Sequence, residues 1–331
     1  MDRLPVELWT WVFLLACVDG GRTGCAISET CHFFRDAVLS VQLHSVALIG
    51  PAKLSVFLRQ VLERRPPEHR RVQHLFLARG PMPLARPSDG PPAIPNRYIS
   101  DWSKRMFALV GPELRTLTTL LGQDPIDCSS VLCNSFPRLE ELTLHGCLLP
   151  PEDVRLQSFY PSLKYLHILS TPSSSTLFTA RAPNLTHLRL SSVWNMSDEL
   201  YAALLRFVSE PAAQSTSSAT TEPEEPPQLL LPSSLSAIII ALDANIVRIE
   251  PGPLHRSGAL HRLQAQDCSG RVHVLDQIKG FNAGHVTSHP RADWNDRITG
   301  GDGCWKLELR PDQGVGAPRP LHPIVGRSAQ I

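Results

Sequence analysis

The residues of this chain that could carry metal or phosphate chemistry are few, and their spacing fits no regular site. Cys128 and Cys133, followed by His145 and Cys147, are the nearest approach to a zinc-binding set. Zinc sites use short, regular ligand spacings, and the spacing here is irregular. Gly300–Gly303 is glycine-rich, but it has neither the G-x-x-x-x-G-K nor the G-x-G-x-x-G spacing of a phosphate loop. We therefore expect no metal and no other cofactor.

Catalytic signatures are also missing from the sequence. It contains no H-E-x-x-H, no G-x-S-x-G and no kinase motif set. Catalytic side chains that only the fold brings together leave no such signature, so an enzyme stays an alternative, and it would predict a deep pocket with convergent polar groups. The sequence favours a protein with no catalytic residues.

Charge and cysteine content indicate which partners and which cellular compartment to expect. The 331 residues include 32 Lys and Arg against 31 Asp and Glu, so no global charge attracts nucleic acid or an anionic membrane. The eight cysteines form no C-x-x-C pair, and several lie inside apolar runs, which predicts buried free thiols. We expect a cytoplasmic or nuclear protein with one elongated domain and a small module.

The first 40 residues predict three short helices and an unusual apolar start. Residues 4–17 are apolar on nearly every face, Pro5 suits the first turn of a helix, and Glu7 complements the helix dipole. Two further helices are predicted over 24–31 and 32–39, after a break at residues 19–22. A module of this size is at the lower limit for a core of its own, so a row such as Leu8, Val12 and Leu15 needs another surface to cover it.

An apolar start of this kind has three other interpretations. A secretory signal needs a basic leader, whereas Asp2, Arg3 and Glu7 give a slightly acidic one, and no small-residue cleavage pattern follows. A membrane span needs about 20 apolar residues, and residues 8–18 are too few. A plain core helix of a larger domain stays open. The pattern favours a docking helix, with no signal peptide and no transmembrane segment.

Several of these residues together resemble a known motif. Leu4-Pro5-x-Glu7-Leu8, Val12-Phe13, Leu15 and Cys31, with Phe33-Phe34-Arg35, are similar to the F-box, by which F-box proteins hold the Skp adaptor of cullin-RING ubiquitin ligases. The resemblance covers about residues 3–48, and the loop at 19–23 is longer than usual. It implies packing roles for Cys31, Phe34 and Leu39. The residues that it implies to face the adaptor are Leu4, Pro5, Leu8, Val12, Phe13 and Leu15.

An internal repeat organises the rest of the chain. The pattern Leu-x-x-Leu-x-Leu begins at Leu139, recurs 24 residues later at Leu163 and 22 residues after that at Leu185, each time in a Pro-x-Leu entry. These intervals are typical of leucine-rich repeats, in which a short parallel strand points alternate leucines inward. Weaker copies begin at residues 72, 114, 235 and 260. We therefore predict an α/β chain: a short all-α three-helix F-box-like module, then an irregular leucine-rich-repeat solenoid with a parallel sheet.

The predicted organisation follows from these patterns. Residues 1–48 form the module, 49–70 a linker with an amphipathic helix over 53–63, 71–310 the repeat domain, and 311–331 a tail. Return helices are expected over 101–111 and 197–208, and mobile insertions over 80–95 and 209–227. Trp305, Leu307 and Leu309 alternate with polar residues, which predicts an edge strand within 292–309 that caps the solenoid.

The expected function is that of a non-catalytic substrate-recognition adaptor of an SCF-type ubiquitin ligase. Its partners would be a Skp-type adaptor and a target protein that the sequence does not identify. The side chains between the leucines of the strands would bind the target. These candidate residues are Glu141, Thr143, His145, Tyr165, His167, His187 and Arg189. The alternative is a leucine-rich-repeat scaffold without a ligase role, whose N-terminal helices merely cap the arc and are buried against its first repeat.

Overall fold

The computed structural model describes residues 4–79, 96–120, 134–145, 160–169, 182–193, 198–209, 231–243, 253–278 and 288–306. The expected insertion at 80–95, all but the first residue of the one at 209–227, and the tail at 311–331 lie outside the described residues. Cys128, Cys133 and Cys147 lie outside them as well.

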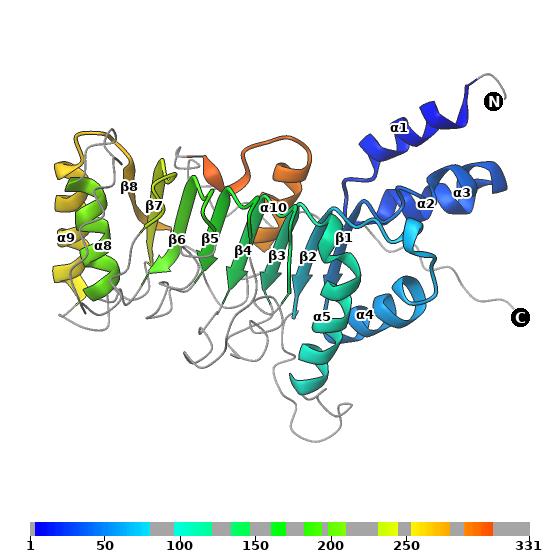
Figure 1. The fold of residues 1–331 in the computed structure, drawn as a ribbon, viewed down its shortest axis with the longest axis horizontal. Helices are drawn as coiled ribbons and strands as arrows, with labels where there is room; N and C mark the ends of the chain where they lie inside the picture. The colour runs from blue at the N-terminus through cyan, green and yellow to red at the C-terminus, as the bar shows by residue number, and fades with distance from the viewer. Residues whose placement is uncertain are drawn as a thin grey trace, which may run out of the picture.

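One parallel sheet runs along the long axis of the molecule (Figure 1). Among the described residues it has eight strands, which pair in chain order, so each new strand adds to the edge left by the one before it. This confirms the predicted α/β class and parallel sheet. The strands are β1 (Ser45–Ile49), β2 (His74–Ala78), β3 (Thr116–Leu120), β4 (Glu141–His145), β5 (Tyr165–Leu169), β6 (His187–Val193), β7 (Ala237–Asp243) and β8 (Val272–Ile278).

The same tight turn leads into successive strands. The backbone N–H of Leu139 donates to the carbonyl of Phe136 over 3.2 Å, and Leu163 and Leu185 repeat this bond to the third residue before them. In each copy a proline follows the acceptor residue, and the fixed φ angle of the proline suits the second position of the turn. The Pro-x-Leu entries of the sequence are therefore these turns.

Helices cover one face of the sheet, and the core lies between them and the strands. Two apolar side chains from each of β4, β5 and β6 point to this face and are almost fully buried. They are Leu142 and Leu144, Leu166 and Ile168, and Leu188 and Leu190. The helical elements that contribute to this core are α4 (Pro51–Val56), a π-helical turn (Phe57–Leu62), α5 (Asn96–Val110), α8 (Asp198–Ser209) and α9 (Pro253–Gln266). The helices expected at 53–63, 101–111 and 197–208 are confirmed, and α5 begins five residues before its predicted start.

Two elements differ from the expectation. The predicted strand around Leu260 and Leu263 is helix α9, and strand β8 follows it. Leu-x-x-Leu spacing fits a helix face as well as the start of a repeat, and here both leucines are buried on one side of the helix. Strand β1 was not predicted, so the sheet begins at Ser45, inside the range 1–48 that the sequence assigned to the module.

The three predicted N-terminal helices are present as α1 (Val6–Ala16), α2 (Arg22–Thr30) and α3 (His32–Val38). They share a small core that is separate from the main one. Its buried members are Phe13, Cys17, Ala37, Val38 and Val41, and Trp9, Leu14, Ile27 and Phe34 pack against them.

Hydrogen bonds fix this module to the free edge of β1. The Ser45 hydroxyl donates to the carbonyl of Cys17 over 2.6 Å and accepts from the N–H of Gly20 over 3.0 Å. The N–H of Ala47 donates to the carbonyl of Gly20. Gly20 has φ of +80°, and a Cβ there would lie 2.8 Å from the Ala47 Cβ, so only glycine fits. The module is therefore held in one orientation on the sheet.

Candidate functional site

Helix α1 exposes a continuous apolar stripe to solvent. Leu8, Trp11, Val12 and Leu15 stand at i, i+3, i+4 and i+7, and their exposed fractions are 49%, 64%, 50% and 75%. Leu4, two residues before the helix begins, is also exposed. We call these five residues the α1 stripe. Figure 1 shows α1 projecting away from the sheet.

Five of the six residues predicted to face an adaptor are exposed: Leu4, Pro5, Leu8, Val12 and Leu15. Phe13 is not, so its predicted role in direct adaptor contact is wrong. Phe13 is 5% exposed and lies on the inner side of α1, with its ring 5.7 Å from that of Trp9 and 5.3 Å from that of Phe34. Trp11 was missed, although its place three residues after Leu8 was a sufficient signal.

The cysteines of the module also differ from the expectation. Cys17 is buried, and burial, with the nearby charge of Asp19, raises the pKa of its thiol to about 11. Cys31, however, is exposed and caps α3 by accepting a hydrogen bond from the Phe34 N–H over 3.5 Å, so it does not pack the helices together. Cys25 and Cys268 are exposed as well.

The seven residues predicted to bind a target lie together on the face of the sheet opposite the leucines. Strand register places Glu141, Tyr165 and His187 in one row across three strands, and Thr143, His167 and Arg189 in the next. His145 continues the same face of β4. The structure therefore brings them together, as the alternation along each strand predicts.

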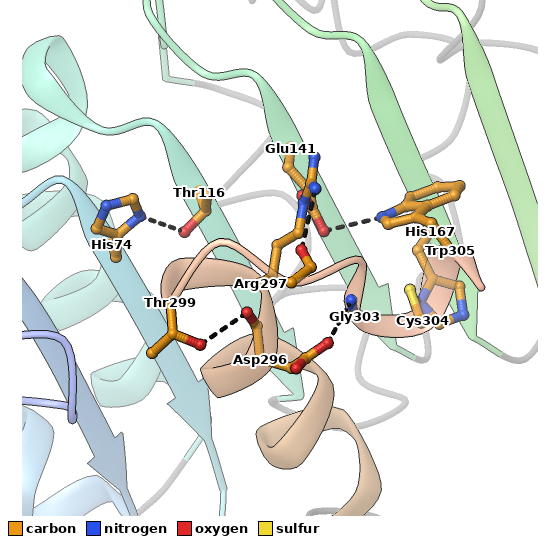
Figure 2. Close-up of polar contacts among 11 residues, drawn as sticks. His74, Thr116, Glu141, His167, Asp296, Arg297, Thr299, Gly303, Cys304 and Trp305 are labelled. Atoms are coloured by element: carbon orange, nitrogen blue, oxygen red, sulfur yellow. Dashed lines mark hydrogen bonds and ion pairs between the residues drawn. The ribbon is translucent and has the colours of Figure 1, made fainter. Parts of the chain in front are cut away.

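This face is not open to solvent, because the C-terminal segment of the described chain crosses it (Figure 2). We call residues 288–306 the strap; it contains α10 (Ser288–Ile298) and a 3-10 turn (Gly303–Trp305). Trp294 packs on Phe76, with ring centroids 5.6 Å apart, in a cluster that includes Leu120 and Leu169. The expected edge strand and end cap are therefore wrong for residues 292–305, while Leu307 and Leu309 lie outside the described residues.

Glu141 is the anchor of the strap on the sheet. One of its carboxylate oxygens accepts from Arg297 Nε over 2.5 Å, and the other accepts from the Trp305 indole N–H over 3.0 Å. The Arg297 guanidinium also lies 4.7 Å from the centre of the Tyr165 ring. Burial lowers the pKa of Arg297, but the hydrogen bond and charge of Glu141 outweigh it and leave that pKa raised. Arg297 is therefore held as a cation.

A second group of contacts joins the strap to β5 and β6. The Cys304 thiol lies 3.4 Å from His167 Nδ1, while His167 Nε2 lies 2.9 Å from the Ser191 hydroxyl. The Arg189 guanidinium donates to the backbone carbonyl of Cys304. Burial raises the pKa of Cys304 to about 12 and lowers that of His167 well below its usual value. The two groups are therefore neutral at pH 7, whereas cysteine nucleophiles act as thiolates.

Buried histidines predict a marked loss of stability in mild acid. Burial lowers the pKa of His44, His145 and His167. Burial and the nearby charge of His44 lower the pKa of His74 to about 3. Such a histidine binds a proton more readily in the unfolded chain, so stability falls as the pH drops below about 6.5. At pH 5 the penalty for His74 is on the order of 2 kcal/mol.

Urea denaturation at pH 7 and pH 5, monitored by circular dichroism, measures this loss. The variant His74→Gln, which cannot titrate in this range, is expected to lose less stability between the two pH values than the parent. Equal losses in parent and variant would show that His74 does not contribute.

Comparisons of the chain with protein-family models, with curated proteins and with solved structures give no match. In the parts of the chain that the structure describes, no helix is long and apolar enough to cross a membrane. Within the same residues, no group of three or more His, Cys, Asp or Glu side chains could hold a metal ion.

Proposed function

We propose that this protein is a non-catalytic substrate-recognition adaptor of a cullin-RING ubiquitin ligase. Its N-terminal helices would dock on a Skp-type adaptor in the manner of an F-box, and its repeat domain, similar to leucine-rich repeats, would bind a target protein. The single observation that carries the proposal is the exposed α1 stripe on the residues that resemble an F-box.

Helix α1 has apolar residues on both its inner and its outer face, and only the inner ones pack in the core of the module. Phe13 and its aromatic neighbours already fill the core of the module, so the stripe is not needed for folding. Contiguous exposed apolar surface on a folded protein commonly marks an interaction site, because burying it against a partner is favourable. Trp11 in particular belongs to the residue types that dominate interface energies.

The attachment of the module to the sheet supports the ligase role further. Delivery of ubiquitin needs a fixed distance between the adaptor and the bound target. Hydrogen bonds from Ser45 and Ala47 hold the module on β1, and Arg65 donates to the side chain of Gln42 over 2.5 Å. A partner docked on α1 would therefore have a defined position relative to the sheet.

Replacing Leu8 and Leu15 together by aspartate tests the proposal. Both side chains are exposed, so the fold is expected to survive, whereas two charges in a buried apolar interface should weaken adaptor binding by at least about 100-fold. A pull-down of the full chain with a purified Skp-type adaptor measures this. Val56→Asp is the matched control, because Val56 on α4 is 49% exposed, as Leu8 is. Binding by the double variant at the parent level would rule out α1 as the docking face.

The second candidate is a repeat scaffold without a ligase role. It is favoured by the bonds between Gly20 and Ser45, through which the module covers the edge of β1 as a cap would. It predicts that the parent chain does not bind a Skp-type adaptor at all. Against it, α1 presents its stripe to solvent and does not bury it on the sheet.

A further inference from the structure

The contact between the strap and the sheet is largely polar at β4 to β6. Glu141, His167 and Arg189 are each less than 10% exposed, yet all three are polar or charged and each contacts the strap or a neighbour through a hydrogen bond. If this face of the sheet only packed against the strap, apolar residues would serve at these three positions, because a buried ion pair contributes little net stability. The other face of the same strands carries only leucine and isoleucine at the corresponding buried positions.

The strap is also organised by its own contacts. Asp296 accepts a hydrogen bond from the Gly303 N–H over 2.8 Å, and a Cβ at Gly301 would lie 2.5 Å from the Asp296 carboxylate. The segment therefore folds back around Asp296 and sits on the sheet as a unit. Its fit is incomplete, since the Trp294 indole nitrogen and an oxygen of Asn295 are buried without a hydrogen-bond partner. Such groups cost about 1–3 kcal/mol each.

We infer that the face of β4 to β6 is the target-binding surface, that it takes a peptide segment with an arginine close to an aromatic residue, and that the strap occupies it as an internal ligand. This inference rests on the proposed function in one respect, namely that the sheet binds a target. It adds the chemistry of that target and the means by which the surface is kept covered.

The groups beneath the strap define what a target must offer. Glu141 presents two acceptor oxygens, which take a guanidinium donor and an indole donor side by side. Tyr165 supplies a ring against which both Arg297 and Trp305 lie. Arg189 donates to a peptide carbonyl. An extended acidic or purely aliphatic segment would leave Glu141 buried without a hydrogen-bond donor and would be rejected.

Opening the strap tests the inference. The variant Arg297→Glu places a second carboxylate against Glu141 and is expected to release the strap. Arg291→Glu is the matched control, because it makes the same charge change on the same helix and leaves the Arg297–Glu141 pair in place. Trp305→Ala is a second variant, which removes the indole donor without adding charge. Circular dichroism establishes that each full-length variant remains folded.

The probe is a fluorescent synthetic peptide of residues 288–306, with serine at position 304, whose binding is followed by anisotropy. An attached strap acts at an effective concentration in the millimolar range, so it should block the parent and the Arg291→Glu control. The peptide is expected to bind Arg297→Glu and Trp305→Ala at least tenfold more tightly. A peptide carrying glutamate in place of arginine at position 297 should not bind.

Reactivity of the Cys304 thiol gives an independent measurement. Cys304 is partly buried between the strap and the sheet, so it should react with a maleimide slowly at pH 8, and at least tenfold faster in the two opened variants. Mass spectrometry of the peptide that contains Cys304 separates its reaction from that of the exposed Cys25, Cys31 and Cys268. No rise in either peptide binding or Cys304 reactivity would overturn the inference and make the strap a fixed part of the core. Retention of a Skp-type adaptor, measured on the same variants, reports on the proposed function separately, because α1 is untouched.

Discussion

Replacement of Phe13 by alanine is expected to unfold the N-terminal module, and with it to abolish docking, although Phe13 does not face a partner. Its side chain is the centre of the small core, in contact with Trp9 and Phe34 on two sides. A buried Phe→Ala change costs about 3–5 kcal/mol. A core of this size rarely supplies more than about 3–5 kcal/mol in total, so the loss is of the same order as the whole.

Hydrogen exchange of the backbone amides of α1 and α3, followed in increasing urea, measures the effect, because these two helices carry this core. Leu15→Ala is the control on the same helix: at 75% exposure it should change stability by less than about 0.5 kcal/mol while still weakening adaptor binding. If Phe13→Ala proved as stable as Leu15→Ala, the division of α1 into an inner and an outer face would be incorrect.

This division shows where sequence reasoning reached its limit. Residues 6–16 are apolar on almost every side, so periodicity alone does not tell which face the other helices cover. The answer depends on the position of Phe34 and Val38, which come from α3 and have no sequence relation to α1. The helices were predictable from local signals, but the direction of Phe13 was not.

The strands were more predictable, because their signal is local and repeats. Each Pro-x-Leu entry makes its own turn, and the leucines that follow alternate inward within five residues. Strand β1 lacks such an entry. It forms because β2 offers a free edge and because Ser45 and Ala47 bond to Gly20. Its existence thus depends on contacts made by the assembled fold.

The strap lies furthest from what a sequence can predict. Its anchor joins Arg297 to Glu141, which are 156 positions apart. The alternation along each strand predicts that the candidate target-binding residues share one face of the sheet, and they do. It does not predict that the strap covers this face. The i, i+4 pair Trp294 and Ile298 in an otherwise polar helix was the available signal that α10 covers something.

Replacement of Phe136 by alanine is expected to cause the largest loss of stability in the sheet, about 3–5 kcal/mol. Phe136 is fully buried in the turn before β4, between Phe107 of α5 and Tyr160 of the next turn. The ring of Phe107 meets it edge-on at 5.6 Å, and the ring of Tyr160 lies parallel to it at 6.0 Å. Two aromatic rings that are themselves buried cannot easily collapse into the space left behind.

Another turn of the same chain has alanine at the position that Phe136 occupies. Ala182 occupies the corresponding position before Pro183 and is fully buried, so the turn itself does not require a ring. The loss at Phe136 would therefore measure packing and not turn geometry. Phe136→Leu should cost less, because it fills most of the space. Hydrogen exchange should show the loss first in β3 to β5, since each strand of such a stack depends on its neighbours. A loss below about 1 kcal/mol in Phe136→Ala, or protection lost evenly over all strands, would mean that this aromatic stack does not join the successive turns.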